Sequence, residues 1–161
     1  MKALKYITLL LIMLTAAAIF YAGFIYLHCT VDIVQVQVNS TASTQAYERF
    51  ASDVQAIQNK TIAGRVFSQI DDTQDYYYVD YNVQIKNNLF VDMNAIELQI
   101  LPKTGDVFQA EVAPAHIAKQ SDGIVNATIL SSKNNIGTRD LQISYYVWGI
   151  PFSMRYTYGA K

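Results

Sequence analysis

The 161-residue chain has little of several features that mark other classes of protein. One cysteine excludes a disulfide framework and any metal site made of several cysteines. Three prolines and seven glycines exclude collagen-like and low-complexity chains. Charged residues make up only 16% of the chain and the net charge is −1, so no nucleic-acid partner is expected. A hydrophobic content of 52% excludes a disordered, highly charged chain.

One uncharged run supplies much of this hydrophobic content. It extends from Tyr6 to Leu27, 22 residues without a charged side chain. A helix of this length rises about 33 Å, which is enough to cross a hydrocarbon core of about 30 Å. We therefore expect a single transmembrane helix and assign residues 1–28 to a membrane anchor with a short N-terminal segment.

The basic residues around this run predict its orientation. Lys2 and Lys5 precede it, and no other basic residue occurs before Arg49. The positive-inside rule then places the N-terminus in the cytoplasm. Residues 29–161 are expected to form an extracytoplasmic domain attached to the cell membrane.

A cleaved signal peptide is the alternative interpretation of the same run. The small residues Ala16, Ala17 and Ala18 suit a cleavage site. However, residues 19–27 remain strongly apolar, so cleavage would leave an exposed apolar tail, and an uncleaved signal-anchor is favoured. Cys29 follows bulky residues rather than the small ones expected before a lipidated cysteine, so we interpret it as a lone thiol or as a partner for another chain.

The remaining chain is dominated by alternation with a period of two, which is typical of half-buried strands. Between residues 45 and 59 the apolar positions instead follow one face of a helix. Turn residues separate the alternating segments. The predicted strands are residues 31–39, 64–70, 77–85, 96–100, 107–112, 124–130, 141–147 and 152–158. This pattern predicts a mainly β protein, an antiparallel immunoglobulin-like β-sandwich of seven to eight strands with one inserted amphipathic helix.

Residues 78–88, which read YVDYNVQIKNN, carry a resemblance to a known family. They resemble the central strand of late-embryogenesis-abundant group 2 domains, and the similarity extends over residues 64–158. Asn87, Asn88 and Leu89 stand where the plant members favour an Asn-Pro-Asn motif. The resemblance implies a β-sandwich behind an N-terminal anchor, without catalytic residues, in a family associated with stress protection, membrane association and binding.

Few residues could carry catalysis or bind a metal. His28 and His116 are the only histidines, and no nucleophile elbow accompanies them. Asp71, Asp72 and Asp75 form an acidic turn that could attract Ca²⁺, but a solvated turn is the favoured interpretation. We therefore expect no catalytic residue, no cofactor and no metal.

Aromatic residues are the most distinctive feature of the predicted domain. Alternation directs Tyr77, Tyr81 and Tyr145 toward the core. It directs four others to the opposite faces: Tyr76, Tyr78, Tyr146 and Trp148. Exposed aromatics on a sheet can anchor a partner, although they can equally form cross-strand pairs that stabilise the sheet.

These observations support three hypotheses about function. The first is a non-enzymatic, membrane-anchored, extracytoplasmic module that binds or assembles with a protein partner of the cell envelope. The second is a protective or lipid-associating domain of the late-embryogenesis-abundant type. The third and most remote is an enzyme with an unrecognised site, which would need a deep pocket with perturbed titratable groups.

Overall fold

The computed structural model describes residues 2–28, 31–71, 74–135 and 137–159. The chain divides into two compact units, Met1–Thr30 and Val31–Lys161. The first contains the helix α1 (Lys2–His28). From Leu4 to Phe24 this helix is long and apolar enough to cross a membrane, and none of that stretch is buried. The Thr8 and Thr15 hydroxyls donate to backbone oxygens one turn back, so these side chains present no unsatisfied donor to apolar surroundings.

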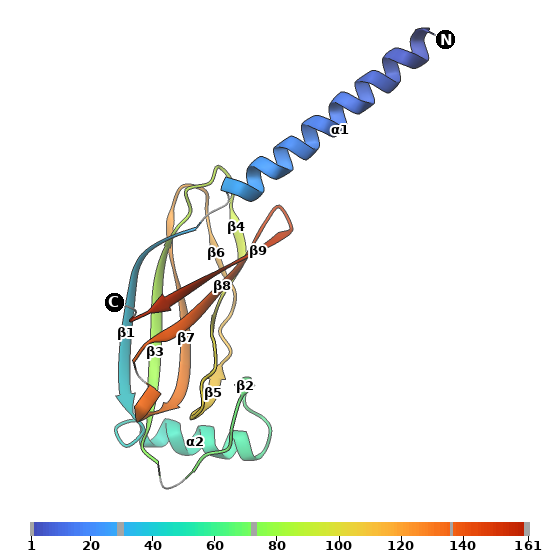
Figure 1. The fold of residues 1–161 in the computed structure, drawn as a ribbon. Helices are drawn as coiled ribbons and strands as arrows, with labels where there is room; N and C mark the ends of the chain where they lie inside the picture. Colours follow the sequence, from blue (N-terminus) through green and yellow to red (C-terminus); the bar gives the residue numbers. More distant parts are fainter. Residues whose placement is uncertain (1, 29–30, 72–73, 136, 160–161) are drawn as a thin grey trace. The chain divides into compact units, whose positions relative to one another are not determined.

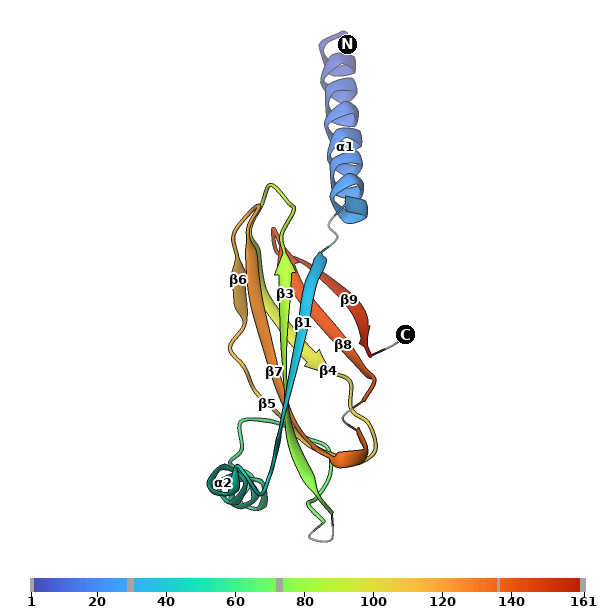
Figure 2. The same ribbon diagram turned by 90° about the vertical axis from the view of Figure 1, so that its left-hand side faces the viewer.

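The second unit consists of two antiparallel sheets that form a sandwich (Figures 1 and 2). Over the described residues it contains nine strands, the helix α2 (Tyr47–Gln58) and a short 3₁₀ helix η1 (Lys133–Asn135). In spatial order, the first sheet is β1 (Asp32–Ala42), β3 (Tyr76–Lys86), β7 (Asp122–Ser132), β5 (Asp106–Ala110) and β2 (Gly64–Val66). The second sheet is β6 (Ala115–Ile117), β4 (Met93–Ile100), β8 (Arg139–Val147) and β9 (Ile150–Tyr158).

The core lies between the sheets and follows the alternation in the sequence. On β3 the side chains of Tyr81, Val83 and Ile85 are completely buried, while the residues between them, Asn82 and Gln84, are only partly buried. Strands β4 and β8 show the same pattern, and Leu141 and Ile143 are completely buried there. Period-two burial on both sheets is what a two-layer sandwich requires.

The predicted β-sandwich and its inserted helix are confirmed, but the strand count of seven to eight is too low. The additional strand is β6, whose three residues are too few to show an alternating pattern. It forms because the chain crosses from the first sheet to the second after β5 and pairs with β4 at Met93 and Ile96.

The two ends of the sandwich, the near end and the far end, carry different elements. The near end is the end at which β1 begins; there Asp32 lies opposite Lys86, and Asn94 lies opposite Tyr146. It carries the β3–β4 loop, residues 87–92, and the turn between β8 and β9. The far end carries α2 and η1 (Figure 1).

Candidate functional site

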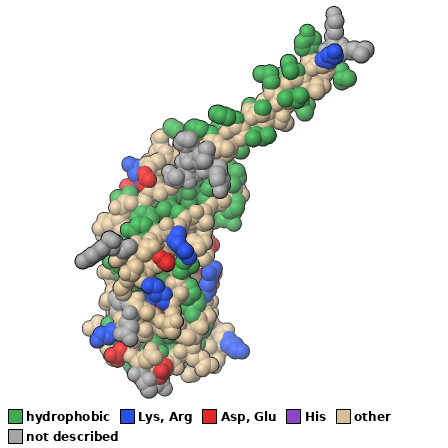
Figure 3. All heavy atoms as spheres, viewed as in Figure 1, with side chains coloured by type: hydrophobic (Ala, Val, Ile, Leu, Met, Phe, Trp, Pro, Cys, Tyr) green, Lys and Arg blue, Asp and Glu red, His purple; other side chains and the backbone are tan. Residues whose placement is uncertain are grey.

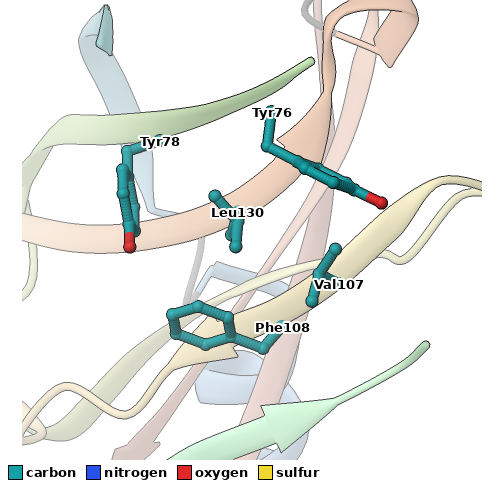
Figure 4. Close-up of a cluster of buried hydrophobic side chains, with 5 residues drawn as sticks. All are labelled: Tyr76, Tyr78, Val107, Phe108 and Leu130. Carbon is teal, nitrogen blue, oxygen red and sulfur yellow. The ribbon is translucent and has the colours of Figure 1, made fainter. Parts of the chain in front are cut away.

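The expected aromatic face is wrong for two of its four residues. Tyr76 is 4% exposed and Tyr78 is 1% exposed. Both point into a cluster with Val107, Phe108 and Leu130 (Figure 4). They do lie on the side of β3 away from the main core, but side chains of α2, including Phe50 and Ile57, cover that side. Alternation predicts which face a side chain takes, but not whether another element covers that face.

Tyr78 is fixed by polar contacts as well as by packing. Its hydroxyl donates a 2.6 Å hydrogen bond to Oδ2 of Asp53 on α2. The Arg49 guanidinium carbon lies 4.2 Å from the ring centroid, within reach of a cation–π interaction. Burial, reinforced by the hydrogen bond to Asp53, raises the pKa of Tyr78 above its ordinary value. The cluster is therefore a second small core that attaches α2 to the first sheet.

The other two aromatic residues remain accessible. Tyr146 is 44% exposed and Trp148 is 53% exposed. Trp148 and Gly149 form the two-residue turn between β8 and β9, with φ angles of 51° and 77°. Two consecutive positive φ angles are typical of tight hairpin turns, and glycine adopts them without strain. These residues belong to the second sheet and the near end, so they share no surface with Tyr76 and Tyr78.

A groove lies on the side of the sandwich opposite β1 and β9. It has a volume of about 390 Å³. Its lining comes from β2, from β4, from residues 109–115, which run from the end of β5 to the start of β6, and from residues 124–126 of β7. Ile96, Leu98 and Val125 are buried and give the groove an apolar floor. No pattern in the sequence indicates this groove, because its walls come from four separate segments.

One wall of the groove is an open strand edge. Strand β7 pairs with β3 along its whole length, but with β5 only from Ile129 to Ser131. Among the described residues, no strand pairs with the remaining part of that second edge, residues 122–128. Ser132 donates its backbone N–H to the Gly105 oxygen, toward β5. The N–H and C=O groups of successive residues point to opposite edges of a strand. Those of Ile124 and Asn126 therefore point to the same edge as those of Ser132, which is the open edge.

The side chain of Gln109 closes one end of the groove. It makes hydrogen bonds to the backbone of β4 that a neighbouring strand would otherwise make. The Gln109 amide oxygen accepts a 3.1 Å hydrogen bond from the Ile100 N–H, and its nitrogen donates to the Leu98 oxygen at 3.3 Å. Gly64 lies against the same residue, because a Cβ at position 64 would lie 2.2 Å from the Gln109 backbone oxygen. This close approach of β2 to β5 requires glycine.

The rim of the groove is polar and exposed. Arg65 donates a 3.1 Å hydrogen bond to the Gln99 side-chain oxygen. The carboxylates of Glu97 and Glu111 also line the groove. These three are its only ionisable side chains among the described lining residues, and the rim therefore has a small excess of negative charge. An apolar floor, an open strand edge and a polar rim together suit an extended peptide.

A buried ion pair at the far end is separate from this groove. Arg139 donates to both Asp106 oxygens, at 2.7 Å and 2.5 Å, and both side chains are completely buried. Burial alone would raise the pKa of Asp106, but hydrogen bonds from Arg139, Ser131 and the Lys103 amide hold that pKa below its ordinary value. No solvent reaches the pair, so its role is structural.

The remaining candidates are surface residues. His116 is exposed; its Nδ1 lies 2.8 Å from the Asn94 amide oxygen and its Nε2 lies 4.0 Å from Asp92. Asp71 is exposed and accepts a hydrogen bond from Gln74. Asp72 and Cys29 lie outside the described residues. Within the described part of the chain, no three His, Cys, Asp or Glu side chains gather as a metal site would need.

Comparison with known proteins assigns neither a family nor a function to the chain. No family model, curated protein or solved structure matches the chain. The groove must therefore be interpreted from its own geometry.

Proposed function

We propose that the protein is a single-pass, membrane-anchored binding module whose extracytoplasmic sandwich holds an extended segment of a partner protein of the cell envelope. The length and composition of α1 support the anchor. Lys2 and Lys5 support a cytoplasmic N-terminus. The proposed role is binding rather than catalysis.

The open edge of β7 beside an apolar floor is the observation that carries this proposal. An extended peptide can add to such an edge as a new strand, with main-chain hydrogen bonds giving affinity and pockets for alternate side chains giving selectivity. Ile124 and Asn126 supply the backbone donors and acceptors, and the buried Leu98 and Val125 supply the apolar contact. The Gln109 amide limits how far the peptide extends along β4.

The rim charges indicate what kind of segment fits. Glu97 and Glu111 outnumber Arg65, so a segment with a net positive charge is favoured over an acidic one. Its apolar side chains would contact the floor at every second position.

Photocrosslinking in native membranes tests this function. A photoreactive phenylalanine analogue replaces Ile124, which is 62% exposed at the groove, in the full chain. The matched control carries the same analogue at Tyr47, which is 71% exposed on α2. The proposal predicts an adduct from position 124 alone, mapped by peptide mass spectrometry to one contiguous segment of the partner.

A backbone variant separates strand addition from simple proximity. Asn126→Pro removes one open-edge N–H and leaves the hydrogen bonds between β7 and β3, because proline is tolerated where the N–H faces outward. Asn126→Ser keeps the N–H and serves as the control. The adduct should disappear in Asn126→Pro and persist in Asn126→Ser; an adduct that is equally strong in both variants would overturn strand addition, and no adduct from position 124 would overturn the groove as the binding site.

A further inference from the structure

The β3–β4 loop at the near end is held rigidly by one buried side chain. Asn87 is 0% exposed, and its amide nitrogen points at the backbone oxygens of Val91, Ile117 and Ala118 at 2.9, 3.3 and 3.1 Å. Its side-chain oxygen accepts a 3.0 Å hydrogen bond from the Leu89 N–H. The loop is therefore preorganised, since its conformation is fixed from inside the sandwich.

This fixed loop displays a large apolar side chain. Phe90 is 83% exposed, more than any other large hydrophobic side chain described in the sandwich. The neighbouring β8–β9 turn displays Trp148, and Ile150 beyond it is 42% exposed. Both segments lie at the end of the sandwich where β1 begins (Figures 1 and 2). On the face shown in Figure 3, hydrophobic side chains gather toward this end and most charged side chains lie farther along the sandwich.

We propose that Phe90 and Trp148 insert into the interfacial region of the membrane that carries the protein. This inference rests on the anchoring proposed above, but it does not depend on the groove. The chain enters the sandwich at the near end, with Val31 as the first residue of that unit and only residues 29 and 30 following the end of α1. Tryptophan favours the membrane–water interface because its ring is apolar while its N–H can remain hydrated.

The charges around the two aromatic residues indicate the kind of attraction. Lys86 and Lys119 are exposed at this end, together with Asp32, Asp92 and Asp122, which lies opposite Lys86. Because this leaves a small excess of negative charge, electrostatic attraction to anionic lipid does not drive the insertion. Insertion is therefore expected on zwitterionic vesicles and is expected to be insensitive to salt.

The sequence offers a direct probe, because Trp148 is the only tryptophan in the chain. The full chain is reconstituted into phosphatidylcholine vesicles that contain lipid brominated either near the top of the acyl chain or near the bilayer centre. Trp148 emission should shift to shorter wavelength and lose most of its intensity with the shallow bromines. The deep bromines should quench it less.

A second single-tryptophan chain provides the control. Trp148→Phe combined with Tyr47→Trp moves the probe to α2 at the far end, where the side chain is exposed. Bromolipid should leave this emission unchanged. In a third variant, Phe90→Ser with Trp148 retained, shallow quenching should be weaker because one of the two inserted side chains is lost.

The outcomes separate this inference from the anchoring. Flotation of the chain with the vesicles, followed by shallow quenching of Trp148 alone, supports both. Flotation with equal quenching at positions 148 and 47 would overturn the inserted near end and leave the anchor intact. Failure to float with the vesicles would overturn the anchor and this inference with it.

Discussion

The two ends of the sandwich differ in whether their aromatic side chains are covered: those at the far end are buried, and those at the near end are exposed. At the far end, α2 covers the aromatic side chains of β3, and a buried ion pair ties the start of β5 to the start of β8. At the near end, one neutral side chain, Asn87, organises the loop, and Phe90 and Trp148 stay exposed. The far end is thus covered by α2, whereas the described residues of the sandwich leave an apolar surface exposed at the near end.

The difference shows that aromatic residues with the same position in the strand alternation can either stabilise the fold or remain exposed for contact with another molecule. Tyr76 and Trp148 were expected on one exposed aromatic face, yet Tyr76 stacks on Phe50 with ring centroids 6.2 Å apart and Trp148 remains half-exposed. What decides between the two roles is whether another element covers the side chain, as α2, which precedes β3 in the chain, covers Tyr76. Four substitutions or changes of condition test this contrast.

The largest effect is expected from breaking the buried ion pair. Asp106→Asn leaves the Arg139 guanidinium buried without its counter-charge, which should lower the free energy of unfolding by about 3–5 kcal/mol. The measurement is urea unfolding of the full chain in detergent, followed by the near-ultraviolet circular dichroism of its tyrosines.

The double variant Asp106→Leu with Arg139→Met is the control for this substitution. It removes both charges together, so it should recover much of the lost stability. A loss below about 1 kcal/mol in Asp106→Asn would show that the far end does not depend on the pair.

At the near end, the corresponding substitution is Asn87→Ala. It leaves the backbone oxygens around residues 91, 117 and 118 without their side-chain donor, so stability should fall by about 1–3 kcal/mol in the same unfolding experiment. Asn88→Ala is the matched control, because Asn88 is exposed and should change stability by less than about 0.5 kcal/mol. Equal effects of the two substitutions would contradict the role of Asn87.

Acid should weaken the far end selectively. The pKa of Asp106 is lower in the folded chain than in the unfolded chain, so its contribution is complete above the unfolded value of about 3.9 and is lost as the pH falls through the folded value. Stability measured over this acid range should fall more steeply in the wild-type chain than in the Asp106→Leu, Arg139→Met chain. Parallel acid profiles would contradict the assignment.

The smallest effect is expected where α2 meets β3. Tyr78→Phe removes the hydrogen bond to Asp53 but keeps the ring in the cluster, and should cost about 1 kcal/mol of stability. Tyr47→Phe removes a hydroxyl from an exposed ring on the same helix and should change nothing measurable. If both substitutions behave alike, the polar contact does not hold the helix in place.

The sequence predicted the architecture because burial in a sandwich is periodic. The alternation of residues 77–85 and 141–147 coincides with the observed strands β3 and β8, and the helix predicted over 45–59 is observed as α2 (Tyr47–Gln58). The strand predicted over 64–70 shortens to β2 (Gly64–Val66) because only three of its residues pair with β5.

The site could not be predicted in the same way because it depends on contacts between distant segments. Asp106 has the sequence context of a turn residue, and nothing local indicates that Arg139 is its partner. The groove arises where β5 leaves β7 and crosses to the second sheet, a topological event without a sequence pattern. Phe90 alone left a signal, because it lies in the apolar run Leu89-Phe90-Val91 that follows two asparagines at a strand end.

Chemical labelling in intact cells tests the contrast between the ends most directly. In a Cys29→Ser background, one chain carries Phe90→Cys and another carries Tyr47→Cys, and a membrane-impermeant maleimide is applied from outside. Position 47 should react rapidly and position 90 several times more slowly, while both react alike after denaturation. Equal rates in the intact membrane would contradict the membrane-facing near end, and no reaction at position 47 would contradict the extracytoplasmic orientation.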